Sequence, residues 1–228
     1  MYSALLVIIY LAFISLGLPD TLLGSAWPQM HIELNASLSS AGIITMIISM
    51  GTVISSLFSD RLNIKLGTGK VTAISVLMTA VALIGFSLSH SFIILCVLAV
   101  PYGLGAGAVD AALNNYVALH YSSKHMSWLH CFWGVGASIG PYIIGTCMAH
   151  GLGWRGGYSV ISVLQFTLTA ALFITLPLWK KVENSENNVS NGNNESTQEE
   201  PQERKAKSLS EVLHIKGVIY ILFAFFCY

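Results

Sequence analysis

Long stretches of this sequence contain no aspartate, glutamate, lysine or arginine, and each stretch is long enough to cross a lipid bilayer as a helix. These stretches cover residues 1–19, 34–59, 71–109, 125–154 and 156–179. A membrane-spanning helix needs about 20 mainly apolar residues. The stretch 71–109 contains 39 residues, so it must hold two helices, and we place the break near Ser89-His90-Ser91. The chain is therefore expected to be an integral membrane protein.

The charged residues are concentrated in one segment, which separates this chain from soluble proteins. They make up 10% of the 228 residues, against about 25% in an ordinary soluble domain. Thirteen of them lie in residues 180–216, so the rest of the chain has too few to form a water-facing surface. Residues 1–179 are predicted to form an all-α membrane domain, a bundle of six transmembrane helices. We place the spans at residues 4–27, 38–59, 70–89, 92–118, 126–149 and 156–179.

The polar segment 180–216 is expected to be a cytoplasmic and largely disordered linker. Its Asn- and Glu-rich part, residues 182–207, cannot bury enough apolar surface to offset the conformational entropy lost on folding. The apolar residues 217–228 are expected to be the start of a seventh span. A helix of that length covers only about 18 Å of a hydrocarbon core of about 30 Å. We therefore expect the printed sequence to stop inside a membrane helix, and not to transport alone.

The lysine and arginine residues predict the orientation, because the cytoplasmic loops of a membrane protein carry the excess of these residues. If the N-terminus is cytoplasmic, ten of the eleven basic residues fall inside and only Arg155 falls outside. We expect a protein of the cell (inner or plasma) membrane, with its N-terminus and segment 180–216 in the cytoplasm and the lipid bilayer around its spans. The formal net charge is zero, which gives no reason to expect nucleic acid as a partner.

A short motif occurs twice at related positions. Gly17-Leu-Pro-Asp20 and Gly107-Ala-Val-Asp110 both fit the pattern G-x-x-D, and each lies late in the first helix of a group of three spans. Three spans reverse the chain direction, so the two acids would lie at opposite depths in the membrane. This arrangement is typical of inverted repeats in transporters. The sequence therefore predicts two inverted three-helix repeats.

Asp20 and Asp110 are acidic residues inside predicted spans. A charged side chain in the middle of a membrane costs at least about 2.5–3.5 kcal/mol, and such residues usually serve a function. A carboxyl group removed from water can take up and release a proton near neutral pH. We predict Asp110 first, and Asp20 second, as sites of proton coupling. The alternative is a structural carboxylate bonded to neighbouring helices. Pro19 lacks a backbone donor and is expected to kink the first span beside Asp20.

Other polar and aromatic residues share helix faces with one another near these acids. Asn114 lies four residues after Asp110 and therefore on the same face. His130 and Trp133 are three residues apart in the fifth span, which places an ionisable ring beside a flat aromatic ring. Such combinations suit sugars, because C–H faces stack on aromatic rings while hydroxyls bond to amides and carboxylates. Packing of Trp133 against lipid and a purely structural, hydrogen-bonded His130 are the alternatives.

Six spans, a long polar linker and a seventh span together resemble the N-terminal half of a major facilitator superfamily transporter. Asp60-Arg61, between the second and third spans, resembles the core of that superfamily's signature loop, although Ser56 and Asn63-Ile64 depart from it. The resemblance implies a missing C-terminal six-helix half and alternating access of a small-molecule substrate between the halves. It also implies that Asp60 and Arg61 hold the inner gate. An ordinary solvated loop pair is the alternative.

A narrower resemblance is to the fucose permease branch, the sugar–proton symporters of this superfamily. In the fourth span, Asp110 is followed after three residues by an asparagine and then by an aromatic residue nearby. In the fifth span, the pattern L-x-x-F-x-x-x-G is met by Leu129, Phe132 and Gly136. The resemblance implies that the acids of the first and fourth spans, Asp20 and Asp110, serve proton coupling and sugar binding. Asp20 is therefore also a predicted substrate-binding residue, beside Asn114, His130 and Trp133.

Departures from that branch leave the substrate and its direction open. The fourth-span acid is Asp rather than Glu, Asn115 stands where proline is usual, and His130 and Trp133 replace amide side chains. The solute is therefore a sugar or a similar small polar molecule, and the coupling ion is a proton or sodium. Residues 136–145 also resemble the fifth-span motif of drug–proton antiporters, which makes a drug or metabolite exporter the second hypothesis. Their simpler explanation is a small-residue helix interface with a proline kink.

Other classes of protein fit the sequence less well. A membrane receptor or sensor needs an output domain, and the polar segment is of low complexity. An intramembrane hydrolase is not expected, since no serine has a nucleophile-elbow context, so we predict that the chain is not an enzyme. The four cysteines lie in apolar runs without metal-ligand spacing, so no metal and no cofactor are expected. They are Cys96, Cys131, Cys147 and Cys227.

Overall fold

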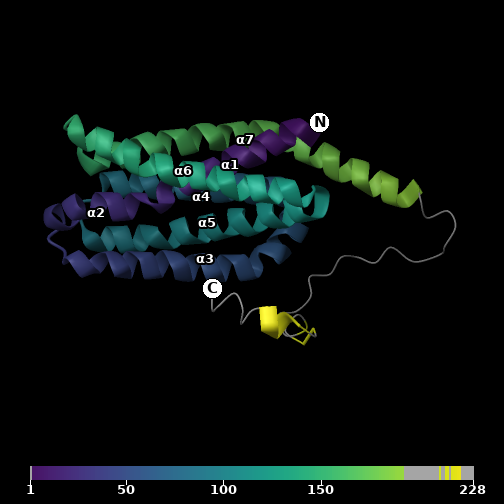
Figure 1. Cartoon of the computed structure of the whole chain (residues 1–228), viewed down its shortest axis with the longest axis horizontal. Helices are drawn as coiled ribbons and strands as arrows, with labels where there is room; N and C mark the ends of the chain where they lie inside the picture. The colour runs from purple at the N-terminus through teal and green to yellow at the C-terminus, as the bar shows by residue number, and fades with distance from the viewer. Residues whose placement is uncertain (1, 193–210, 212–213, 216, 222–228) are drawn as a thin grey trace. The chain divides into compact units, whose positions relative to one another are not determined.

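The computed structural model describes residues 2–192, 211, 214–215 and 217–221. The helices of the first unit, drawn in Figure 1, are α1 (Tyr2–Asp20), α2 (Leu22–Glu33), the 3-10 turn η1 (Leu38–Ser40), α3 (Ala41–Leu66), α4 (Thr68–Leu88), α5 (Phe92–His120), α6 (Ser123–Ala149) and α7 (Gly153–Gly192). In the second unit, Asn194–Tyr228, the described residues 218–221 are helical. Most of the predicted seventh span, and the linker from residue 193 to 210, lie outside the described residues and stay predictions.

The six predicted spans are confirmed as long apolar helices. Stretches long and apolar enough to cross a membrane are Leu5–Glu33, Leu38–Leu66, Thr68–Leu88, Phe92–His120, Ser123–Ala149 and Gly153–Trp179. The predicted break near Ser89-His90-Ser91 is also confirmed, since α4 ends at Leu88 and α5 begins at Phe92. Helices form here because the bilayer core offers no water to satisfy backbone N–H and C=O groups, and a helix satisfies them internally.

The first span is interrupted next to Asp20, as the proline before it predicts. α1 ends at Asp20, α2 begins at Leu22, and Thr21 between them is not helical. Pro19 cannot donate a backbone hydrogen bond, and its ring disturbs the preceding turn. Asp20 therefore sits at the end of one helix rather than in the middle of a continuous span.

The prediction of a loop at Asp60-Arg61 is wrong, because both residues are helical. α3 continues to Leu66, so both residues lie inside this helix, and only Gly67 separates it from α4. Nothing in the sequence from 60 to 66 breaks a helix, because it contains neither proline nor glycine. Gly67 has φ +81°, and its N–H donates to the carbonyl of Asn63 at 2.9 Å. A glycine with positive φ is a common helix stop.

The predicted disorder of segment 180–216 needs a correction at its beginning. α7 continues as a helix to Gly192, beyond the predicted span end at residue 179 and into the polar segment. Once a helix is nucleated, each added residue gains a hydrogen bond without a new nucleation cost. No proline or glycine occurs between Lys180 and Asn191, so the packed span extends outward until Gly192.

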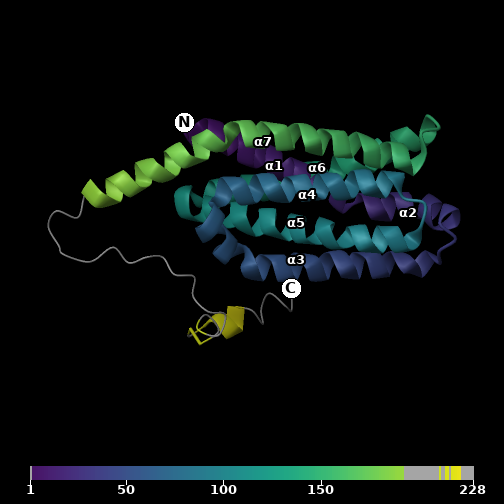
Figure 2. The same cartoon turned by 180° about the vertical axis from the view of Figure 1, so that it is seen from behind.

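The spans pack in a pattern that repeats between the first three and the last three. Span 1 (α1 and α2) packs on span 5 (α6), and span 4 (α5) packs on span 2 (α3). Span 3 (α4) contacts spans 4 and 6, and span 6 (α7) contacts span 1. If spans 1, 2 and 3 are exchanged with spans 4, 5 and 6, each of these contacts becomes another contact of the same set or stays the same. The predicted inverted repeat requires this symmetry. Figures 1 and 2 show α3 and α7 at opposite edges of the bundle.

Glycines bring the paired spans into backbone contact. A Cβ atom on Gly136 of α6 would lie 2.1 Å from the carbonyl oxygen of Ile14, and one on Gly140 would lie 2.2 Å from that of Leu18. Such distances exclude any side chain at these positions. The glycine pattern resembling the antiporter motif is therefore used, in its first two glycines, as a small-residue interface between α1 and α6.

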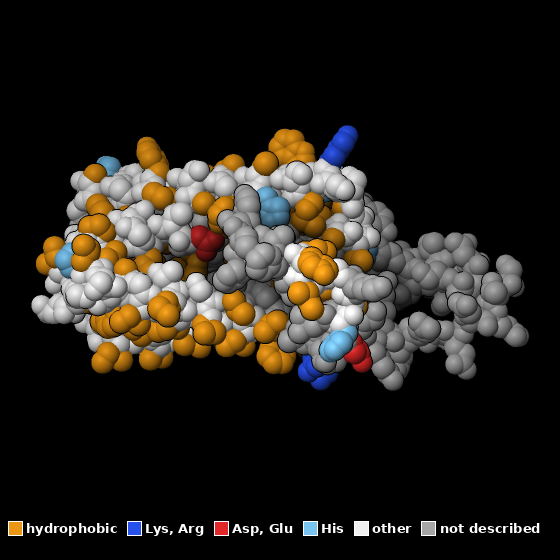
Figure 3. Space-filling model, turned by 60° about the horizontal axis from the view of Figure 1, so that its bottom comes forward, with side chains coloured by type: hydrophobic (Ala, Val, Ile, Leu, Met, Phe, Trp, Pro, Cys, Tyr) orange, Lys and Arg blue, Asp and Glu red, His pale blue; other side chains and the backbone are white. Residues whose placement is uncertain are grey.

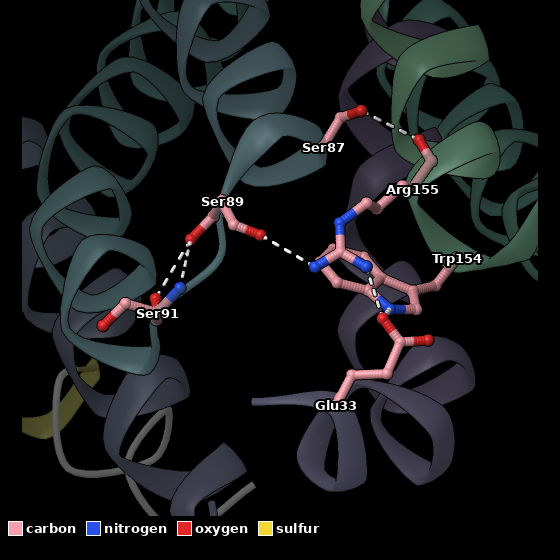
Figure 4. Close-up of polar contacts among 6 residues, drawn as sticks. All are labelled: Glu33, Ser87, Ser89, Ser91, Trp154 and Arg155. Atoms are coloured by element: carbon pink, nitrogen blue, oxygen red, sulfur yellow. Dashed lines mark hydrogen bonds and ion pairs between the residues drawn. The ribbon is translucent and has the colours of Figure 1, made fainter. Parts of the chain in front are cut away.

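One end of the bundle is joined by an ion pair and an aromatic ring (Figure 4). Arg155 Nη1 donates to Glu33 Oε2 at the end of α2, and Arg155 Nη2 donates to the carbonyl oxygen of Ser89 at 3.0 Å. The guanidinium lies 4.2 Å from the ring centroid of Trp154, whose Nε1 donates to Glu33 Oε2 at 3.0 Å. Arg155, the basic residue predicted outside, is thus paired and links the ends of α2, α4 and α7.

Candidate functional site

A cavity of about 470 Å³ collects side chains from four helices. Its lining comes from α1 (Phe13, Leu16, Asp20), α3 (Thr45, Ile48, Ser49, Thr52), α5 (Ala106, Asp110) and α6 (His130, Trp133). On the face drawn in Figure 3, acidic and histidine side chains lie in the middle of a surface that is otherwise rich in hydrophobic side chains. Ionisable residues in membrane-spanning helices usually face a bundle interior or a cavity and mark functional sites.

The predicted coupling and substrate residues come together at this cavity. Asp20, Asp110, His130 and Trp133 all line it. Asn114 is absent from the lining, but its Nδ2 donates to Asp110 Oδ1 at 3.0 Å. The two acids are 90 residues apart in sequence and come from spans 1 and 4, which are equivalent in the repeat. The structure thus assembles one polar site from both repeats.

Asp20 is bonded to side chains of two other helices. Trp133 Nε1 of α6 donates to Asp20 Oδ2 at 2.9 Å, and the Tyr102 hydroxyl of α5 donates to Asp20 Oδ1 at 3.3 Å. An indole N–H can only donate, so it needs an acceptor such as a carboxylate. Packing of Trp133 against lipid alone, the alternative to a cavity role, does not describe this contact, because its N–H points to the acid.

Asp110 is bonded differently, within its own helix. Its only hydrogen bond to a described side chain is from Asn114, one turn later in α5. Carboxylate oxygens can each accept two hydrogen bonds, so Asp110 keeps acceptor capacity toward the cavity that it lines. His130, on the same cavity, packs edge-on against Phe13 with ring centroids 6.1 Å apart. Among the described residues no hydrogen bond to His130 is found, so both its cavity role and its structural role stay predictions.

Asp60 and Arg61 lie away from this cavity. Both are exposed residues of α3, and neither lines the cavity. Within residues 2–192 neither has an ion pair with a described side chain, since the one recorded there is Glu33–Arg155. Their predicted gating role depends on a second half of the transporter and stays a prediction.

Sequence reasoning missed Tyr102 and the hydroxyl groups of α3. Thr45, Ser49 and Thr52 line the cavity, at spacings of four and three residues. Such spacing places them on one face of a helix, so a polar stripe in an otherwise apolar span was the available signal. Tyr102 had no comparable signal, because its contact with Asp20 bridges 82 residues of sequence.

The lining chemistry sets what this cavity can hold. It combines two carboxyl groups, one imidazole, three hydroxyls and an indole, while no lysine or arginine of the described residues lines it. Carboxyl and hydroxyl groups can bond to a solute rich in hydroxyls, and an aromatic ring can stack on its apolar face. The carboxyl groups can also carry a proton. The imidazole of His130 is the basic group of this lining.

The chain is similar to a protein family, to an uncharacterized transporter and to a synaptic vesicle glycoprotein. Residues 9–228 match the family described as the Major Facilitator Superfamily. The chain is 25% identical over 116 residues to the uncharacterized transporter y4wD of Sinorhizobium fredii, covering 50% of this chain and 31% of that protein. It is 24% identical over 178 residues to synaptic vesicle glycoprotein 2B of Rattus norvegicus, covering 75% of this chain and 26% of that protein.

The aligned part thus spans about a third or less of the length of these curated relatives. The family match, in contrast, covers almost the whole chain, and the six apolar helices agree with an integral membrane protein of that family. The chain belongs to the Major Facilitator Superfamily.

Proposed function

We propose that this chain is the N-terminal half of a proton-coupled transporter that takes up a sugar or a similar small polar solute by alternating access. The observation that supports this most is that Asp20, Asp110, His130 and Trp133 line the same cavity. Placing two acids in a membrane domain costs free energy, so such residues usually serve a function. Because both line the same cavity, we assign them to one function. The cavity also offers hydroxyl and aromatic partners for a polyhydroxylated solute.

Asp110 is the proposed protonation site and Asp20 the second. Asp110 accepts one hydrogen bond from its own helix, so its protonation breaks no hydrogen bond between the described helices. Asp20 accepts hydrogen bonds from Trp133 and Tyr102, so it serves better as a fixed acceptor that orients the solute. Asn114, His130 and Trp133 complete the substrate-binding wall, with Trp133 offering its ring for stacking.

The partners of this half follow from the same proposal. A C-terminal six-helix half supplies the facing wall of the cavity, and rocking of the two halves exposes the solute to each side in turn. Asp60 and Arg61 hold the inner gate against that half. The N-terminus and segment 180–216 face the cytoplasm, in line with the lysines and arginines of the sequence. The coupling ion is a proton, with sodium as the alternative that the experiment distinguishes.

Uptake by proteoliposomes containing the complete gene product tests this proposal. A panel of radiolabelled monosaccharides is offered under an inward proton gradient, an inward sodium gradient or no gradient. We expect proton-driven accumulation, accompanied by acidification of the lumen. Asp110→Asn should reduce that accumulation by about tenfold or more, because an amide cannot carry the proton. Asn115→Ala, an exposed neighbour that does not line the cavity, is the matched control.

The outcomes separate the hypotheses. Full proton-driven uptake by the Asp110→Asn variant contradicts the coupling role of Asp110. Accumulation that follows the sodium gradient alone replaces the proton by sodium. Alkalinisation of the compartment that the solute enters indicates an antiporter, and therefore the exporter that the sequence keeps as a second hypothesis.

A further inference from the structure

A buried hydrogen-bonded pair holds the part of α1 just before Asp20. Pro19 has no N–H, so the carbonyl group of Ser15, four residues earlier, has no helical donor. Gln165 of α7 fills this place, because its Nε2 donates to the Ser15 carbonyl oxygen at 2.7 Å. The Ser15 hydroxyl donates in return to Gln165 Oε1. Both residues are buried, with exposed fractions of 7% for Ser15 and 2% for Gln165.

A second bond of the same kind holds the residue just after Asp20. Pro141 lies inside α6, so the carbonyl group of Ala137 has no helical donor. The Thr21 hydroxyl donates to that carbonyl oxygen at 2.9 Å. Ala137 lies one turn after Trp133, whose indole binds Asp20. Thr21 therefore ties the interruption of span 1 to the same part of α6 that binds the carboxylate.

Near Asp110, the described part of the chain shows no bond of this kind. Pro101 of α5, nine residues before Asp110, also removes a helical donor, from the carbonyl of Val97. In the described part of the chain, no side-chain donor is recorded at that carbonyl. A carbonyl that loses its donor in an apolar interior carries a desolvation cost, and a side-chain donor placed there fixes the local backbone.

We propose that Gln165 and Thr21 are positioning residues, which hold the interrupted end of span 1 so that the Asp20 carboxylate points into the cavity and meets Trp133. The inference rests on the proposed function only in taking the Asp20 carboxylate as a working group of the cavity. Neither residue lines the cavity, so both act through the backbone on either side of Asp20. Loss of the Gln165 amide frees the Ser15 carbonyl, and the last turn of α1 then rearranges to find another donor.

The fluorescence of Trp133 reports on this positioning without any substrate. The complete gene product in detergent is titrated with acid, and the signal of Trp133 is isolated by subtracting the titration of a Trp133→Phe variant. Asp20→Asn identifies the part of the titration that belongs to Asp20. This step is needed because Tyr102 and Asp110 of α5 and His130 of α6 also face this region.

We expect Gln165→Leu and Thr21→Val to move the midpoint of the Asp20-dependent signal by about one pH unit, a tenfold change in proton concentration. Gln165→Glu, whose protonated carboxyl group can donate to Ser15 and accept from it, should restore much of the wild-type midpoint. The matched control is Thr169→Val. Thr169 is also buried, lies one turn after Gln165, and bonds only within α7 to the Gln165 carbonyl at 2.8 Å.

The same midpoint in Gln165→Leu, Thr21→Val and Thr169→Val overturns the inference. If Gln165→Leu does not fold, the comparison of Thr21→Val and Gln165→Glu with Thr169→Val decides in the same way. The proposed function fails separately, when the wild-type protein shows no ion-driven uptake. In that case a displaced midpoint in the variants still shows that Gln165 and Thr21 position Asp20.

Discussion

The segments around Asp20 and Asp110 share a backbone arrangement but differ in how the acid is held. In both G-x-x-D motifs the glycine lies at a close crossing with another span. A Cβ atom on Gly17 would lie 2.1 Å from the Trp133 carbonyl oxygen, and one on Gly107 would lie 2.4 Å from the Thr52 carbonyl oxygen. The acid follows three residues later in both cases and lines the same cavity. The repeat therefore places the two carboxyl groups alike.

The hydrogen bonds then make the two acids different. α1 is interrupted directly after Asp20, whose carboxylate binds donors from α5 and α6. α5 continues without interruption past Asp110 to His120, and the donor to Asp110 comes from the same helix. Through hydrogen bonds among the described side chains, Asp20 therefore joins three helices, whereas Asp110 is bonded within α5. The comparison teaches that a repeated motif can supply one acid bonded across helices and one acid bonded within its own helix.

The largest effect is expected where the two segments are alike. Gly17→Ala and Gly107→Ala each place a methyl group against a backbone carbonyl, which cannot move aside as a side chain does. Overpacking of this kind costs about 1–3 kcal/mol and sometimes more, so both variants should unfold at clearly lower temperature in detergent. Gly145→Ala is the control, since its Cβ atom would meet nothing within 4 Å. A loss of stability in only one of the two variants breaks the equivalence of the repeats.

A smaller effect should separate the two acids. Asp20→Asn replaces the charged acceptor of two hydrogen bonds from other helices by a neutral amide. A hydrogen bond to a charged group contributes about 1.5–3 kcal/mol and a neutral one about 0.5–1.5 kcal/mol, so part of this stabilisation should be lost. In Asp110→Asn the Asn114 amide can rotate and keep its bond, so thermal unfolding in detergent should show less destabilisation. Proton-driven uptake should rank the variants in the opposite order, with Asp110→Asn the more impaired. The same ranking in both measurements contradicts the division of roles.

The smallest effect concerns the second donor to Asp20. Tyr102→Phe removes the longer of the two hydrogen bonds that Asp20 accepts, the one of 3.3 Å, and leaves the aromatic ring in the apolar core. A typical intramolecular hydrogen bond contributes about 0.5–1.5 kcal/mol, so unfolding temperature should fall less than in Trp133→Phe, which removes the bond of 2.9 Å. Phe86→Leu, on a ring that packs near Tyr102, controls for changes in apolar packing. Equal or larger loss in Tyr102→Phe would show that Tyr102 is the main partner of Asp20.

The site residues that could be predicted are those that are unusual in a membrane. Five of them stand out in apolar spans: Asp20, Asp110, Asn114, His130 and Trp133. Four of these line one cavity, and Asn114 donates a hydrogen bond to Asp110, which is one of the four. Their predicted roles remain proposals. The prediction of a loop at Asp60-Arg61 is wrong. It assumed that the helix ends where the charged residues begin, whereas α3 continues to Leu66 and Gly67 ends it.

The sequence by itself determined the six spans and the acids among them, because span length and the cost of charge in lipid depend on residues that are near in sequence. Tertiary structure alone decided which groups bind Asp20, and which group donates to the carbonyl that Pro19 leaves without a helical donor. These contacts bridge 82, 113 and 150 residues. Helix packing brings such residues together, and a tyrosine, tryptophan or glutamine in one span does not show which helix it will face.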